Sequence, residues 1–167
     1  PILLLTFNRP ELVRAQLDRL RRIQPSKLFV SSDGPRASRP GEGALVGACR
    51  AEVTKGVDWT CEIFTKYEVE NLGCGLGVSS AISWFFDQVE EGIIMEDDCQ
   101  LSDSFFPFCQ KLLEVYRYDN EVAGISADFR MLRCERPLNE YGFIRFAQIW
   151  GWASWRRVWQ QYDFTMS

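Results

Sequence analysis

The sequence has no histidine among its 167 residues. This absence excludes Ser-His-Asp triads and zinc sites built on histidine, and leaves a carboxylate as the expected general base of any catalysis. Its six cysteines include no CxxC pair and lack the density of a small disulfide scaffold. We therefore expect free, mostly buried thiols in a reducing compartment, and so a cytoplasmic protein.

The sequence also has no apolar run of the ~18 residues that a membrane span needs, and no signal-peptide pattern. Its net charge of −4 argues against a general nucleic-acid binder, which would carry a basic surface. The chain starts at Pro1, without methionine and directly inside an apolar run. We therefore expect a piece of a longer protein, and a membrane-associated parent stays open.

What is present is typical of a globular domain, with 46% hydrophobic and 14% aromatic residues. The length predicts a single domain over 1–167. Short apolar runs alternate with segments of helical spacing. Expected strands occupy 2–5, 27–32, 59–65, 93–96 and 121–127, and the expected helices begin near 10, 43, 78 and 104.

This alternation predicts an α/β fold, a mostly parallel sheet with helices on both faces. Ligands of such sheets bind beyond the carboxyl ends of the strands. Those ends read Thr6-Phe7-Asn8-Arg9, Ser32-Asp33-Gly34 and Glu96-Asp97-Asp98. Asn8 and Glu11 are also placed as a capping pair for the first helix.

The acids Glu96, Asp97 and Asp98 repel one another, so a dry site would need a compensating charge. A divalent cation shared with a ligand's phosphates is one compensation. The alternative is a solvated turn whose acids favour the N-terminus of the next helix. Charge alone does not separate these two interpretations.

Two further segments carry weaker signals. The stretch NLGCGLG, 71–77, is neither a dinucleotide fingerprint nor a P-loop, and is typical of a flexible turn. Farther on, Trp155, Val158, Trp159 and Tyr162 recur at helical spacing, which predicts a helix with Trp155 and Trp159 in the core. The tryptophans 150 and 152 flank Gly151, and we expect their rings on a loop as a platform for a sugar face.

Together these segments resemble nucleotide-sugar glycosyltransferases of the GT-A fold, particularly N-acetylglucosaminyltransferase I and related bacterial sugar transferases. The matching pieces span most of the chain in family order. They are PILLLTFNRPELVRAQLDRL, FVSSDG, GIIMEDDCQLSDSFFPFCQKLLEVY, VAGISA and WGWASWRRVW.

The resemblance implies a role for each matching residue. It places Thr6, Asn8, Arg9 and Asp33 at the donor nucleotide, with Arg9 and Asp33 on the uridine. It further implies that Glu96 contacts the donor sugar, Asp97 the ribose, and Asp98 a Mn²⁺ (or Mg²⁺) ion that holds the diphosphate. Trp150 and Trp152 would lie on the acceptor side.

The implied reaction is metal-dependent, inverting transfer of a sugar from a UDP-sugar to a hydroxyl of a glycan or other acceptor. The family's catalytic carboxylate precedes a Gly-Trp pair, but 144–152 contains no acid, so Asp128 is the expected base. Two alternatives stay open: a non-catalytic nucleotide-sugar binding module, and a nucleotidyltransferase that builds sugar nucleotides.

Overall fold

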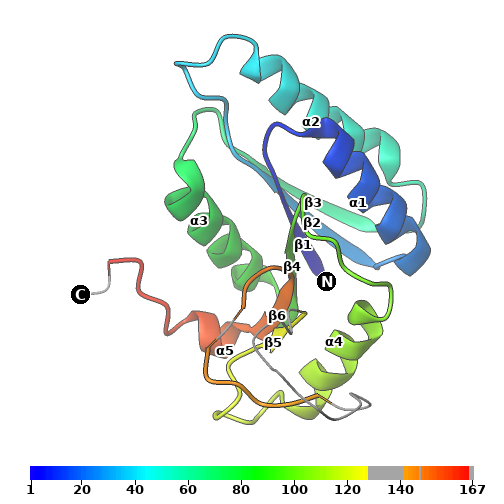
Figure 1. Cartoon of the computed structure of the whole chain (residues 1–167), viewed down its shortest axis with the longest axis vertical. Coiled ribbons are helices and arrows are strands. Elements are labelled where there is room, and N and C mark those ends of the chain that lie inside the picture. Colours follow the sequence, from blue (N-terminus) through cyan, green and yellow to red (C-terminus); the bar gives the residue numbers. More distant parts are fainter. Residues whose placement is uncertain (128–140, 147, 166–167) are drawn as a thin grey trace, which may run out of the picture.

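A computed structural model describes residues 1–127, 141–146 and 148–165 (Figure 1). It contains a six-stranded sheet of order β3-β2-β1-β4-β6-β5. The first four strands in that order pair in parallel, and β6 pairs antiparallel with both β4 and β5. The strands are β1 (Ile2–Thr6), β2 (Lys27–Ser32), β3 (Glu62–Tyr67), β4 (Glu91–Glu96), β5 (Ile125–Ser126) and β6 (Trp152–Trp155).

Helices cover both faces of this sheet. Figure 1 shows α1 and α2 on one side and α3 on the other. The prediction of an α/β fold with a mostly parallel sheet is therefore confirmed. The helices are α1 (Pro10–Ile23), α2 (Glu42–Gly56), α3 (Gly73–Gln88), α4 (Phe105–Val115) and α5 (Arg156–Trp159).

The alternation of side chains along β1 divides the core into two layers. Ile2 and Leu4 join the cluster beneath α1, α2 and α4. Leu3 and Leu5 point to the other face, where they pack with Phe85 and its neighbours on α3. Since β1 is buried along its whole length, it is a central strand, as its unbroken apolar run predicts.

The strand order also fixes where a ligand can bind. From β1 the chain runs outward through β2 to β3, and then returns by α3 to β4 on the other side of β1. The order therefore reverses between β1 and β4. In open α/β sheets the crevice at such a reversal, beyond the carboxyl strand ends, is where ligands bind.

The C-terminal part of the described chain differs from its prediction. The expected fifth strand over 121–127 is reduced to Ile125–Ser126. Trp152–Trp155, expected as loop and helix start, is the strand β6, and the helix that follows is a single turn. Trp155 and Trp159 pack on opposite faces of the sheet, so their helical spacing does not reflect one buried helix face.

Two local predictions were also wrong. Arg9 is the residue that caps α1, no side chain caps this helix, and Asn8 instead donates a hydrogen bond to Glu42 Oε1 at 2.9 Å. The stretch 71–77 is not a free turn, because α3 already begins at Gly73.

Candidate functional site

A cleft of about 330 Å³ lies at the carboxyl ends of the parallel strands, where the start of α3 forms one wall. It is large enough for a small organic ligand. Of the residues predicted from the sequence, it brings together Thr6, Arg9, Asp33, Glu96 and Asp97. These come from three neighbouring strand ends, so the strand-order reversal assembles them.

The acids after β4 meet the guanidinium of Arg9. Asp97 is 2% exposed, and its Oδ1 accepts a hydrogen bond from Arg9 Nη2. Asp98 is half exposed and accepts from Arg9 Nη1 at 2.9 Å. Within the described residues, Asp97 Oδ2 is buried and has no hydrogen-bond partner. A buried carboxylate oxygen left unpaired is costly unless a ligand or ion satisfies it.

The electrostatics of these acids follow from their crowding. Burial raises the pKa of Asp97, and the ion pair with Arg9 offsets this only in part. Burial, followed by the charges of Asp98 and Asp97, likewise raises the pKa of Glu96. The cleft therefore holds carboxyl groups that are destabilised as anions, a condition typical of functional sites.

A buried glutamine on α1 holds the backbone of this acidic turn. Gln16 is 3% exposed and donates through Nε2 to the carbonyl oxygens of Asp97, at 2.9 Å, and Cys99, at 2.7 Å. Arg19 adds a further hydrogen bond to the same Cys99 carbonyl. The sequence signal for Gln16 was a polar residue beside the apolar stripe of α1, and our sequence analysis missed it.

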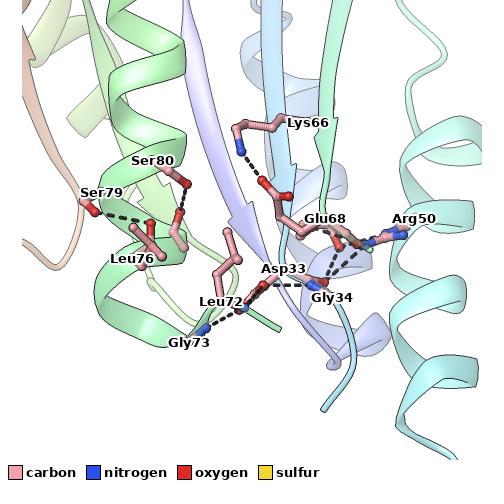
Figure 2. Close-up of polar contacts among 12 residues, drawn as sticks. Asp33, Gly34, Arg50, Lys66, Glu68, Leu72, Gly73, Leu76, Ser79 and Ser80 are labelled. Carbon is pink, nitrogen blue, oxygen red and sulfur yellow. Dashed lines mark hydrogen bonds and ion pairs between the residues drawn. The ribbon is translucent and has the colours of Figure 1, made fainter. Parts of the chain in front are cut away.

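Asp33 caps α3 across a long separation in sequence. Its Oδ1 accepts from the amides of Gly34 and Leu72, both at 2.8 Å. Its Oδ2 accepts from the Gly73 amide at 3.1 Å and from Asn71 Nδ2 at 3.0 Å. Figure 2 shows the carboxylate aimed at the first residues of this helix. An acid at a helix N-terminus is stabilised by the exposed amides and by the helix dipole.

A glycine makes this approach possible. A Cβ on Gly77 would lie 3.3 Å from Asp33 Oδ2, tighter than most packed contacts. Gly77 therefore serves close packing against Asp33, whereas Gly73, with a φ of +78°, serves the turn into α3.

Arg50 ties the ends of β2 and β3 together. It donates to the carbonyl oxygens of Asp33, at 3.3 Å, and Glu68, at 2.6 Å (Figure 2). Its guanidinium also lies over the Tyr67 ring. Lys66 pairs with the side chain of Glu68, which lines the cleft. The wall near β3 is thus rigidly cross-linked.

A second ion pair, between Arg36 and Glu42, borders the cleft, which Arg36 lines. Side-chain hydrogen bonds from Arg36 hold the pKa of the buried Glu42 at about 2, and its Oε1 also accepts from Asn8. The Arg36 guanidinium lies over the Phe7 ring at 5.3 Å. Asn8 thus acts on the shape of the site through Glu42.

Four predicted site residues that the structure describes do not line this cleft: Asn8, Asp98, Trp150 and Trp152. Trp150 is 54% exposed, and Trp152 is a half-buried residue of β6 packed toward α3; neither is among the described residues that line it. The expectation that both rings sit on a loop is wrong for Trp152. Asp128 lies outside the described residues.

The described residues contain no group of three or more cysteine and acidic side chains able to hold a metal ion by themselves. A divalent ion held by one carboxylate and by a ligand's phosphates needs no such group. Asp98, half exposed at the edge of the acidic turn, fits that kind of ligand. To bind the ion it would give up its hydrogen bond with Arg9.

Cysteine burial agrees only in part with its prediction. All five described cysteines are free thiols; Cys49, Cys99 and Cys109 are buried, but Cys74 is exposed and lines the cleft.

No protein-family model and no curated protein matches the chain at a significant level. Across the described residues, none of the helices has the length and apolar character to cross a bilayer. The geometry of the cleft is therefore the basis for a function.

Proposed function

We propose that the chain binds a nucleoside diphosphate sugar in this cleft and transfers the sugar to an acceptor hydroxyl, as a GT-A-like glycosyltransferase domain. The observation that carries the proposal is the convergence of Arg9, Asp33 and the Glu96-Asp97-Asp98 turn at the strand-order reversal. The proposal is supported by Asp97, which lines the cleft and whose Oδ2 has no hydrogen-bond partner among the described residues.

The roles divide along the cleft. Asp98 would hold a Mn²⁺ or Mg²⁺ ion, whose charge would offset that of the departing diphosphate. Arg9, released from Asp98, keeps Asp97 paired and lies where an anionic ligand enters. Asp97 would accept a hydrogen bond from the ribose, and Gln16 holds the backbone carbonyl of Asp97 in place.

In the proposed transfer the acceptor oxygen attacks the anomeric carbon and the bond from that carbon to the diphosphate breaks. The hydroxyl proton passes to a carboxylate. Asp128 stays the candidate for this base.

The test is incubation of the protein with UDP-sugars, Mn²⁺ and hydroxyl acceptors, with separate detection of UDP and pyrophosphate. Transfer or donor hydrolysis, with UDP released, supports the proposal. Pyrophosphate release from a nucleoside triphosphate would instead identify a nucleotidyltransferase. Nucleotide binding without turnover would identify the chain as a non-catalytic binding module. Lys111→Ala, on the exposed side of α4, serves as the control variant.

A further inference from the structure

The cleft contains a side-chain amide whose orientation is fixed. Asn71 lines the cleft, and its Nδ2 donates to Asp33 Oδ2 at 3.0 Å and to the Gly34 carbonyl oxygen at 2.9 Å. Both partners are acceptors only. A flipped amide would place three acceptor oxygens against one another, so the network permits one orientation.

This orientation turns the other end of the amide away from Asp33 and Gly34. Within the described residues, Asn71 Oδ1 receives no hydrogen bond. Asp33, in contrast, accepts four hydrogen bonds from the protein and is occupied with capping α3. Of these two neighbours, Asn71 therefore has the acceptor to offer to a ligand.

The position of Asn71 relative to the acidic turn suits a nucleotide. The Asn71 amide lies 3.0 Å from Asp33, which follows β2, whereas Asp97 follows β4, and two strand spacings of about 4.8 Å separate β2 from β4, about 10 Å in total. That length accommodates a nucleoside diphosphate with its phosphates at the acids and its base near the start of α3.

We infer that Asn71 reads the nucleobase: its Oδ1 accepts the ring N–H of an imide, as in uracil, and thereby selects UDP over CDP. Cytosine presents a bare ring nitrogen at that position, so two acceptors would face each other. The inference rests on the proposed function. It assigns base selection to Asn71 and makes Asp33 the residue that positions it.

The test is calorimetric titration with UDP, CDP and UDP methylated at uracil N3, which lacks the ring N–H. Wild type should bind UDP about tenfold tighter than either analogue. Asn71→Ala should bind all three within about twofold of one another. Asn71→Ser removes the carbonyl but keeps a hydroxyl donor for Asp33, and should give the same result with a fold closer to wild type.

The matched control is Gln88→Ala, which removes an exposed amide at the far end of the same helix and should keep the UDP preference. If the Asn71 variants keep that preference too, or if wild type binds the three nucleotides equally, the inference is wrong while the proposed function stands. If wild type binds none of them, the proposed function fails and the inference fails with it.

Discussion

Replacing Arg9 by methionine tests the electrostatic arrangement of the acidic turn, because it removes the cation and keeps much of the apolar stem. Asp97 is 2% exposed, and its one described side-chain partner is Arg9. Breaking a fully buried ion pair by removing one member costs about 3–5 kcal/mol. Arg9 itself is 41% exposed, so water screens the pair, and we expect a loss of about 1–3 kcal/mol in the free energy of unfolding.

The loss should depend on pH in a defined direction. Burial raises the pKa of Asp97 already in the presence of Arg9, and removing the cation raises it further. A raised carboxyl pKa favours the folded state at low pH, and that contribution is lost as pH rises through the folded-state pKa. The destabilisation by Arg9→Met should therefore be largest near neutral pH and shrink in acid.

Urea denaturation measures the effect, and two variants control it. Arg14→Met removes a solvent-exposed residue of α1 that pairs with Glu52 of α2, and should change stability by less than about 1 kcal/mol. Arg9→Met combined with Asp97→Asn should recover much of the loss, because no buried charge is left unpaired. A loss no larger than that of Arg14→Met, or full additivity in the double variant, would refute the reasoning.

Three other changes give sharp expectations. Hydrogen bonds from Arg36 hold the pKa of Glu42 at about 2 instead of 4.5. The ionised Glu42 therefore stabilises the folded state above pH 4.5, and this contribution is lost as the pH falls toward 2. The melting temperature of wild type should fall more across that window than that of Glu42→Gln. Trp155→Ala should cost about 3–5 kcal/mol in urea denaturation, and Trp159→Ala, half buried, clearly less. Gly34→Ala places a Cβ 2.4 Å from backbone and should lower the melting temperature by several degrees, about 1–3 kcal/mol.

The sheet and much of the cleft follow from local sequence signals. The apolar run at 2–5 and the acids after β4 mark strands and their carboxyl ends, and the topology rule then gathers Arg9, Asp33 and Asp97. Such signals are reliable because the burial of a strand and the periodicity of a helix both depend on residues that are close together in the sequence.

What the sequence did not reveal depends on contacts between distant residues. Asp33 caps a helix that begins 40 positions later, and Asn8 bonds to Glu42 rather than capping its own helix. The β6 segment was predicted as a loop and a helix start because a short aromatic-rich segment fits both periods. Its pairing with β4, Ile93 opposite Ala153, decides the outcome.

The central claim, a nucleotide and metal site at the Glu96-Asp97-Asp98 turn, is tested most directly by titrating UDP with Mn²⁺ and with chelator, in wild type and Asp98→Asn. Because carboxylate and diphosphate would share the ion, wild type should bind UDP more tightly with Mn²⁺. At ~100-fold over its dissociation constant, UDP should add about 2.7 kcal/mol of stability. Asp98→Asn should abolish the metal-dependent part and leave the metal-independent part. Equal binding of UDP to wild type in Mn²⁺ and in chelator would contradict the metal site, and no binding in either would contradict the nucleotide site.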